Sequence, residues 1–487
     1  MSLSAGMEIA KSSLATLQER SSVVSRNVAN ASNDSATRKI AQTITAPGGV
    51  VRLATLTRAA DAALFTKVLT SNAAVGTQQE IVNALTQLDE TVADPEQDFS
   101  PAALVGKLAD ALQQYSAAPE DTVRARSVLD SATDLADTLN TATQKVMSVR
   151  QQADDDIGRS VDKLNTLLAR METVNREIVK GTQAGTDVTD NLDTRDQLLT
   201  DISTEIGIRV VTRANNDIAI YTDSGVTLFD KTARSVSVDA TPVYTATTSG
   251  NPVMVDGIPV TGPTATMAIG SGRLKGLTEV RDTIAVTYQN QLDEIARGLI
   301  ETFAESDQSG SSLPDATGLF SYSGSPTVPT AGTIFPGLAG EISVNAAANP
   351  DVGGDVFLIR DGGINGSSYV YNSSGNAGYT ARIFALADGL SASRSFDPTA
   401  EAGSQDSVID FAATSVGWLQ DQRESKNSAL EFDQTVQERA LDSLTKVDGV
   451  NLDFEMTTLL EIERSYQATS RLISTIDAMY QSLLEAA

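Results

Sequence analysis

The chain has 487 residues, which is enough for two to four domains of ordinary size. Its 36 basic and 63 acidic residues give a formal charge of −27, and this excess disfavours nucleic acid or an anionic membrane as a partner, because both require Lys and Arg at the contact. The chain contains no Cys and no His, which excludes thiolate nucleophiles, Cys/His zinc sites and imidazole bases. Catalysis by Asp and Glu side chains alone remains possible. We nevertheless expect that the chain is not an enzyme and that it has no catalytic, cofactor-binding or metal-binding residues.

The amino-terminal segment Met1 to Lys11 lacks the basic region and apolar core of a signal peptide. No run of 18 apolar residues occurs in the sequence. We therefore expect neither Sec-type secretion nor a membrane-spanning segment.

Helix breakers are concentrated in the middle of the chain. Ten of the 14 prolines and 21 of the 34 glycines lie between Pro242 and Pro398. Proline is absent before Pro47, after Pro398 and from Asp121 to Thr241, so these stretches can form long uninterrupted helices.

Both ends of the chain carry the apolar spacing of a coiled coil. The alternation of three and four residues places one apolar stripe along each predicted helix. Asn451 or Asp448 would cap the second helix. The residues of the two stripes are Leu3, Met7, Ala10, Leu14, Leu17, Val24 and Val28, and then Leu452, Met456, Leu459, Ile462, Tyr466, Thr469, Ile473, Ile476, Tyr480 and Leu483.

A lone amphipathic helix leaves its stripe in water, so each end needs the other end or a neighbouring subunit. Two helices buried in an ordinary globular bundle would explain the same spacing, and periodicity alone does not separate these alternatives.

A longer apolar stripe runs from Leu135 to Ile178 and predicts a helix that ends near Gly181. Shorter helices are expected at 101–115, 194–206, 277–304 and 407–446. Strands are expected at 208–211, 218–221 and 226–229, which form a meander, and at 342–344, 356–359, 369–371 and 379–384.

The pattern predicts an α+β multidomain chain with discontinuous, nested domains. Residues 1–45 with 449–487 would form a terminal coiled-coil inner domain. Residues 46–312 with 396–448 would form a helical bundle with the β meander near 207–272. Residues 313–395 would form an inserted β-rich outer domain.

Three other motifs favour structural roles. Gly270 to Gly276 (GSGRLKG) lacks the spacing of a phosphate loop and predicts a strand-to-helix connection. Asp187, Asp190, Asp193 and Asp196 suit a helix start better than a cation site, with Asp193 as the cap. Asp154 to Asp156 is expected on a solvated helix face, because three successive residues cannot converge on one ion.

The carboxyl-terminal segment resembles the terminal signature of flagellar rod, hook and hook-associated proteins. The matching residues are Gly449 to Met456 (GVNLDFEM), Leu459 to Glu461, Tyr466 to Ala468 and Ile473 to Met479 (ISTIDAM). Near the amino terminus, Asn27, Asn30, Thr37 and Arg38 resemble the N-x-x-N and T-R element of the same group, with Ser35-Ala36 where the group usually has Gly-Tyr.

Within this group, the segment Asn191 to Leu199 (NLDTRDQLL) resembles an element of the hook-associated protein 1 family, the FlgK type, through Asp193, Arg195, Asp196, Gln197 and Leu198. Gly276 to Phe303 and Pro350 to Phe357 also resemble segments of that family.

The resemblance implies a structural subunit of the bacterial flagellum at the hook-filament junction, extracellular, and exported through the flagellar type III apparatus without a cleaved signal peptide. It implies a homo-oligomer in a ring or helical axial assembly, built through the terminal helices. The implied partners are the hook protein, a second hook-filament junction protein and an export chaperone at the carboxyl-terminal helix.

Two other functions remain open at this point. One is another axial protein, namely a hook, rod or flagellin-like subunit. The other is a secreted adhesin or carboxylate-dependent hydrolase carried on a flagellar frame, with its activity in residues 313–395.

Overall fold

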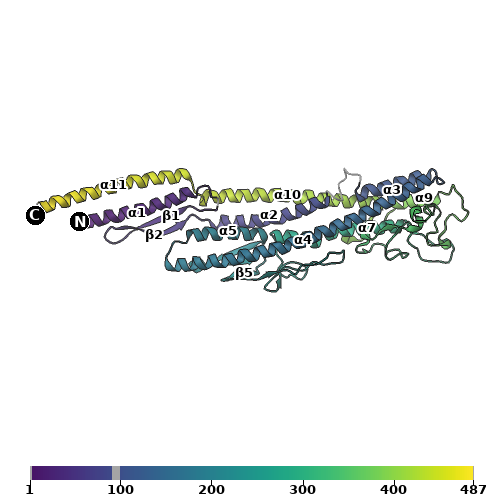
Figure 1. The fold of residues 1–487 in the computed structure, drawn as a ribbon, viewed down its shortest axis with the longest axis horizontal. Helices are drawn as coiled ribbons and strands as arrows, with labels where there is room; N and C mark the ends of the chain where they lie inside the picture. The colour runs from purple at the N-terminus through teal and green to yellow at the C-terminus, as the bar shows by residue number, and fades with distance from the viewer. Residues whose placement is uncertain (1–2, 34, 90–98, 486–487) are drawn as a thin grey trace.

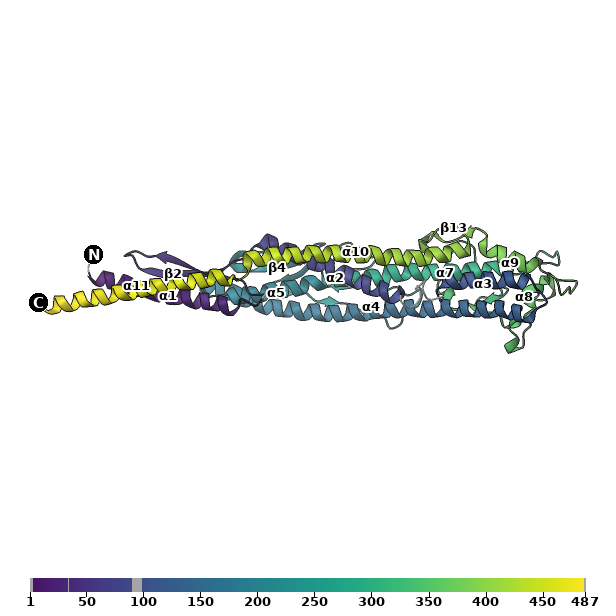
Figure 2. The ribbon, with the colours of Figure 1, turned by 90° about the horizontal axis from the view of Figure 1, so that it is seen from above.

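The computed structural model describes residues 3–33, 35–89 and 99–485. These residues form a long rod with both termini at one end (Figure 1). The first helix, α1 (Leu3–Ala29), and the last, α11 (Leu452–Glu485), lie side by side in both perpendicular views (Figures 1 and 2). The remaining helices form a body that continues the rod beyond them.

Long helices build the body, as the positions of proline predicted. The stripe from Leu135 to Ile178 is buried along α4, which is longer than expected at both ends. Gly185 ends α4 in the left-handed conformation with φ 68°, which glycine adopts without strain. The helices are α2 (Ala62–Leu88), α3 (Pro101–Ser116), α4 (Thr122–Ala184), α5 (Thr189–Glu205), α6 (Arg273–Glu279), α7 (Ala285–Thr302) and α10 (Val408–Asp448).

Helix α2 was not expected from the sequence, although local signals for it exist. Asp61 caps the helix, because its carboxylate accepts the backbone N–H groups of Ala63 and Leu64. Buried residues from Val68 to Leu88 then face the body.

The predicted meander is confirmed as a four-stranded antiparallel sheet in the order β3-β4-β5-β6. A three-stranded sheet of very short strands follows it. The strands are β3 (Ile208–Thr212), β4 (Ile218–Thr222), β5 (Thr227–Asp230), β6 (Thr232–Ala233), β7 (Val236–Ser237), β8 (Met254–Val255) and β9 (Ile258–Pro259).

Residues 313–395 contain less strand than expected. The prediction at 342–344 is confirmed by β11 (Ser343–Val344), which pairs with β10 (Phe320–Ser321). The prediction at 379–384 is wrong, because this segment enters helix α9 (Ala381–Ser391), where Ile383, Leu386 and Leu390 are buried at helical spacing. The prediction at 356–359 is also wrong, since a turn there leads into the short helix α8 (Leu358–Asp361).

The segment 313–395 shares its buried core with the long helices. Phe320, Leu338 and Leu390 belong to the same cluster of buried side chains as the residues of α4 and α7. A last pair of short strands, β12 (Arg394–Ser395) and β13 (Gln405–Asp406), leads into α10. The division into three domains stays a prediction.

A two-stranded antiparallel hairpin of β1 (Lys39–Thr45) and β2 (Val51–Arg58) follows α1. It lies along α1, where the Thr16 hydroxyl donates to the Val51 carbonyl oxygen at 2.9 Å. The domain boundary expected after residue 45 falls between its two strands.

One acidic side chain of α4 is paired with a cation inside the body. Asp154, which was expected on a solvated face, is buried, so that prediction is wrong. Its carboxylate accepts hydrogen bonds from the Tyr244 hydroxyl at 2.9 Å and from the Arg281 guanidinium at 2.6 Å. Because α4 is covered by the chain after β7, the Asp154 side of the helix is withdrawn from solvent.

Glycines allow three helices to approach closely. The segment from Gly270 to Gly276 is a connection from the sheet into α6, as predicted. A Cβ atom added at Gly276 would lie 2.4 Å from the backbone oxygen of Thr77 in α2. A Cβ atom at Gly76 would lie 2.7 Å from the backbone oxygen of Thr204 in α5. Side-chain rotation cannot relieve contacts with backbone atoms.

We expect Gly276→Ala to lower the free energy of unfolding by about 1–3 kcal/mol, the usual range for overpacking. The matched control is Gly158→Ala in α4, where an added Cβ atom has no neighbour within 4 Å. This control should raise stability by about 0.5–1 kcal/mol, since alanine favours helix. Urea unfolding followed by circular dichroism measures the free energy of unfolding of both variants. Equal values for the two would contradict the close approach of α6 to α2.

Candidate functional site

The two terminal helices pack along part of their predicted stripes. Leu17, Val24 and Ile462 form a small buried cluster, and Val28 and Leu459 pack against it. Further along, Gly6 lies against Ile476, whose Cδ1 atom would be 3.6 Å from a Cβ atom added at Gly6. The pairing joins residues more than 400 positions apart in the sequence.

The structure places the predicted stripe residues in three environments. Ala10, Leu17, Val24 and Ile462 are buried. Leu3, Met7, Leu14, Val28, Leu459, Ile473, Ile476 and Tyr480 are half-buried. Leu452, Met456, Tyr466 and Leu483 are exposed.

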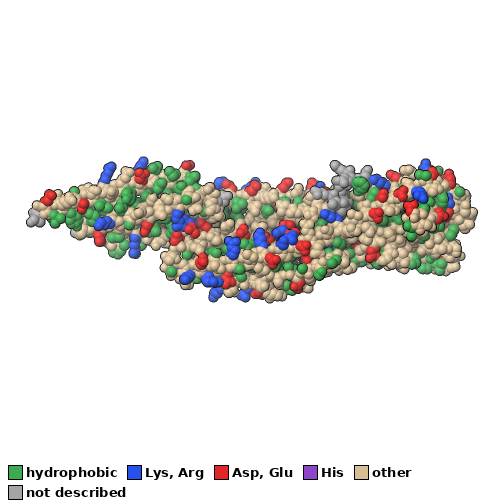
Figure 3. All heavy atoms as spheres, in the orientation of Figure 1, with side chains coloured by type: hydrophobic (Ala, Val, Ile, Leu, Met, Phe, Trp, Pro, Cys, Tyr) green, Lys and Arg blue, Asp and Glu red, His purple; other side chains and the backbone are tan. Residues whose placement is uncertain are grey.

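Helix α11 is apolar over a wider arc than one partner covers. Its exposed large apolar residues are Leu452, Phe454, Met456, Leu460, Tyr466, Leu472, Met479, Leu483 and Leu484. Figure 3 shows apolar side chains gathered over this end of the molecule. Leu3, Ala478, Met479 and Leu483 also line an open groove between the helix tips. Contiguous apolar surface of this kind marks an interaction site.

A cluster of opposite charges connects the terminal helices to the body. We call it the joint: three cations, Arg26, Lys39 and Arg58, face the four aspartates 187, 190, 193 and 196 around the start of α5. Arg26 bridges Asp187 and Asp190, at 2.9 Å each. Arg58 bridges Asp193 at 3.0 Å and Asp196 at 2.6 Å. Lys39 is buried and pairs with Asp193.

These contacts correct one prediction. Helix α5 begins at Thr189, so Asp193 lies within the helix and does not cap it. The Asp187 carboxylate instead accepts the Thr189 N–H at 3.0 Å. The spacing of three residues turns the aspartates toward one side of the helix, where the cations meet them.

The environment shifts the pKa values of the two outer carboxylates, Asp187 and Asp196, in opposite directions. Burial favours protonation of Asp187, but hydrogen bonds from Thr189 and Arg26 outweigh it and hold the pKa of Asp187 below its ordinary value. Burial raises the pKa of Asp196 despite its ion pair with Arg58. A cation removed from this site would therefore leave carboxylates that are partly shielded from water.

The amino-terminal motif residues hold the chain that crosses the joint. The Asn27 side chain binds the backbone of Lys39 twice, accepting its N–H and donating to its carbonyl oxygen, both at 2.9 Å. The Thr37 hydroxyl donates to the Asp193 carboxylate at 2.7 Å. The Arg38 N–H donates to the Asp448 carbonyl oxygen at 2.7 Å, which connects this segment to the end of α10.

The joint also reaches α11. The Arg38 guanidinium lies over the Phe454 ring, 4.9 Å from its centroid. Asn451 caps α11, as expected, by accepting the Phe454 N–H at 3.1 Å.

The remaining motif residues have separate positions. The Asn30 amide donates to the Arg26 carbonyl oxygen at 3.0 Å and closes the end of α1. Arg195 is buried and donates to the Asn216 carbonyl oxygen at 2.6 Å. Leu198 lies in the core, whereas Gln197 is exposed and is not brought into the joint.

The three cations of the joint were not expected from the sequence. The available signal was charge balance, because four aspartates at a spacing of three require cations nearby, and two of the cations, Arg26 and Lys39, directly flank the N-x-x-N and T-R element.

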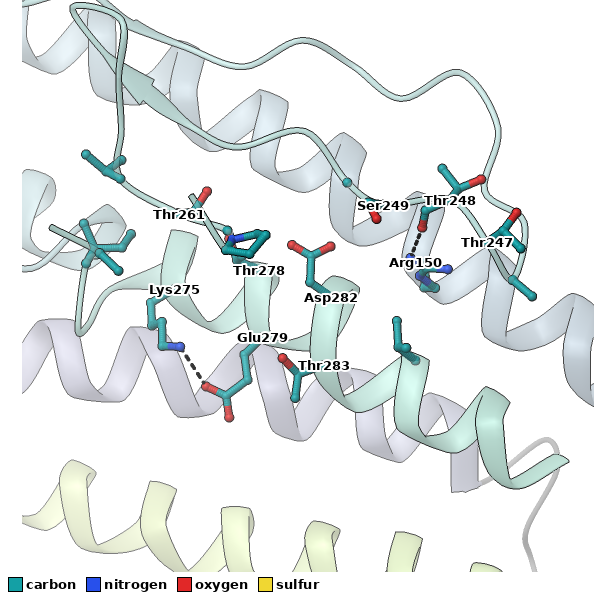
Figure 4. A pocket seen from close by; sticks show the side chains of 18 residues that line it. Arg150, Thr247, Thr248, Ser249, Thr261, Lys275, Thr278, Glu279, Asp282 and Thr283 are labelled. Carbon is teal, nitrogen blue, oxygen red and sulfur yellow. Dashed lines mark hydrogen bonds and ion pairs between the residues drawn. The ribbon is translucent and has the colours of Figure 1, made fainter. Parts of the chain in front are cut away.

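A pocket of about 510 Å³ lies between the 245–250 loop and helices α6 and α7 (Figure 4). Its charged groups are already partnered. Arg150 donates to the Thr248 and Thr245 carbonyl oxygens at 2.6 and 3.0 Å, and Lys275 pairs with Glu279 at 3.4 Å. We assign no ligand to it.

The described residues contain no group of three or more acidic side chains arranged to hold a metal ion. They also contain no helix with the length and apolarity that a membrane span needs.

We expect Arg58→Met to open the joint, because it leaves Asp193 and Asp196 without one of their cations. Removing one partner of a buried pair costs about 3–5 kcal/mol, and 3 kcal/mol would speed hydrogen exchange of the hairpin amides by roughly a hundredfold. The control is Arg52→Met, an exposed arginine on the same strand. Equal exchange in the two variants would contradict a role for the ion cluster.

Two family models match the chain. Residues 85–320 match the model described as the flagellar hook-associated protein FlgK helical domain. Residues 447–486 match the model described as the flagellar basal body rod FlgEFG protein C-terminal.

Curated relatives match over most of their length. Flagellar hook-associated protein 1 of Bacillus subtilis is 22% identical over 98% of this chain and 97% of its own. Flagellar hook-associated protein 1 of Salmonella typhimurium is 22% identical over 82% of this chain and 83% of its own. A solved structure, that of the flagellar hook junction protein FlgK from Burkholderia pseudomallei, overlaps 53% of this chain and 46% of its own, with a TM-score of 0.43 and 18% identity.

The helical body and the carboxyl-terminal helix thus match the same group of flagellar proteins, and the chain resembles flagellar hook-associated protein 1 along nearly its whole length.

Proposed function

We propose that this chain is a structural subunit of the bacterial flagellum that forms the junction between hook and filament. The observation that carries the proposal is the apolar surface left open on α11 after it has paired with α1. Copies stacked in an axial assembly would cover that surface.

The energetics favour assembly over a free monomer. Fully burying one Leu or Met side chain contributes about 1.5–3 kcal/mol, and nine large apolar residues of α11 are exposed. This gain would offset the entropy lost when the helix ends become fixed between neighbours. The small buried cluster between α1 and α11 would serve as the starting unit for that packing.

The proposed partners follow from position. The chain would form a homo-oligomeric ring or helical axial layer, between the hook protein and a second junction protein. Before export through the type III apparatus, a chaperone would cover the apolar face of α11. The subunit would act outside the cell and would have no catalytic role.

The alternative of a hook, rod or flagellin-like subunit is less favoured. The match at residues 447–486 is to the model described as the flagellar basal body rod FlgEFG protein C-terminal, whereas the match at residues 85–320 is to the FlgK helical domain. The match at residues 85–320 covers the larger part of the body. We found no observation that favours an adhesin or hydrolase.

Deletion of the gene is expected to leave hooks without filaments and to release flagellin into the medium. Antibody against the chain should label isolated flagella at the hook tip alone. Label along the rod, hook or filament would assign the chain to another axial position and reject the junction role.

We expect Leu472→Asp to block incorporation into flagella without changing the thermal stability of the purified chain. Leu472 is 52% exposed, so a charge there costs the monomer little, but it would be buried in the assembly. The control is Gln481→Asp, which places the same charge at an exposed polar position of α11. Filament counts by electron microscopy and melting curves give the two readouts, and normal assembly of Leu472→Asp would refute burial of this face.

A further inference from the structure

We propose that a tight turn on the body of one copy inserts into a groove between α2 and α10 of the next copy. We call this turn the knob. It consists of Asp256 and Gly257, which join β8 to β9, and of Ile258 directly after them. The inference rests on the proposed assembly of the chain, and it names a lateral contact separate from the terminal helices.

The groove has a volume of about 490 Å³ and is lined by small side chains of two long helices. Phe432 and Val436 also line it, and they are 68% and 39% exposed. Such apolar surface is open to a large side chain from another molecule. The small residues that line the groove are Thr70, Ser71 and Ala74 of α2 and Ala440 and Ser443 of α10.

The knob lies at the surface of the body, and all three of its residues are exposed. Asp256 and Gly257 have φ angles of 47° and 79°, which fit the tight two-residue turn of a β-hairpin. Ile258 is 48% exposed although its side chain is large and apolar. A hairpin turn therefore presents an apolar side chain that a groove on another copy can bury.

The charges at the groove and at the knob are complementary. Lys67 and Arg439 line the groove, and neither has an ion-pair partner among the described residues. The ion-pair partner of Asp256 is Arg234, at 3.5 Å and at the surface. Exposed pairs of this kind contribute little, so Asp256 can instead pair with Lys67 or Arg439 of a neighbour. Asp433, which also lines the groove, would then face Arg234.

A chain of hydrogen bonds crosses the body from the groove to the knob, so the two lie at one height along the rod. Beside the groove, the Gln437 amide of α10 donates to the Asn72 side-chain oxygen of α2 at 2.7 Å. The Asn72 amide in turn donates to the Ser203 hydroxyl of α5 at 3.5 Å. The three helices therefore meet at the level of the groove.

From α5 the connection continues through α4 to the knob. The Ser160 hydroxyl of α4 donates to the Glu205 carboxylate at the end of α5. Asn165, roughly one and a half turns further along α4, binds the backbone of Val236 at 2.8 and 3.0 Å. The Asp256 N–H donates to the carbonyl oxygen of the residue before Val236 at 2.9 Å. The knob is thus connected to the groove with little displacement along the rod.

The groove helices and the strands lie on opposite sides of the body. Figure 1 shows α10 along the upper side and β5 along the lower side, with α5 and α4 between them. The hairpin of the knob follows β5 in the chain, and its neighbour β7 packs on α4. Complementary features on opposite sides produce a head-to-tail contact, and a rotation that repeats it generates a ring or helix. The groove therefore fits the knob of a second copy of this chain.

The absence of Cys permits a direct test by cross-linking. Ile258→Cys combined with Val436→Cys, treated on isolated flagella with a short bis-maleimide, should give a ladder of multimers. The matched control combines Ile258→Cys with Glu438→Cys, an exposed position two residues further on α10 that faces another side of the helix. The control and each single variant should give no ladder. A missing ladder from the first pair, or equal ladders from both pairs, overturns the contact.

Filling the groove is a second test. Thr70→Trp should reduce filament-bearing hooks at least about tenfold in a strain lacking the native gene, because its ring would occupy the space of the knob. The control is Thr414→Trp, the same change at an exposed position of α10 outside the groove, which should assemble normally. Since both threonines are exposed, the melting curves of both purified variants should match that of the native chain.

Equal filament counts for Thr70→Trp and Thr414→Trp would overturn the proposal. Hook-tip labelling decides the proposed function independently. Label at the tip without a ladder from Ile258→Cys with Val436→Cys would reject this contact alone.

Discussion

The packing of α1 against α11 is the constraint on which the rest of the structure depends. Leu17 and Val24 can leave water only if Ile462 reaches them from the other end of the chain. The chain must therefore run out along α2 and α3, back along α4, out again along α5 to α7 and back along α10, so that both termini meet at one end (Figure 1). Because its two ends lie together, the chain can present both terminal helices to the same neighbours.

The joint makes this arrangement specific. Hydrophobic packing of two helices tolerates rotation and sliding, whereas ion pairs and hydrogen bonds require defined positions. The contacts of Asn27 with Lys39, and of Arg58 with Asp193 and Asp196, orient the terminal helices on the body. Copies in an axial assembly would repeat one orientation, and a defined joint would supply it.

The proposed contact surface on α11 is apolar for a physical reason. The apolar face of α11 gains most from burial, which suits the deeply packed part of an assembly.

The sequence by itself determined where the long helices α1, α4, α10 and α11 lie, because proline is absent from them and their apolar stripes persist over many turns, whereas it did not reveal α2. It also indicated the resemblance to flagellar hook-associated proteins, through motifs at both ends. Tertiary structure alone decided what surrounds Asp154 and Asp193. Local spacing predicted Asp154 in solvent and Asp193 at a helix cap. In the fold, distant segments supply Arg281 to Asp154, and Lys39 and Arg58 to Asp193. The strand expected at 379–384 became α9 for a related reason, since a short apolar run fits either period until its neighbours bury one face.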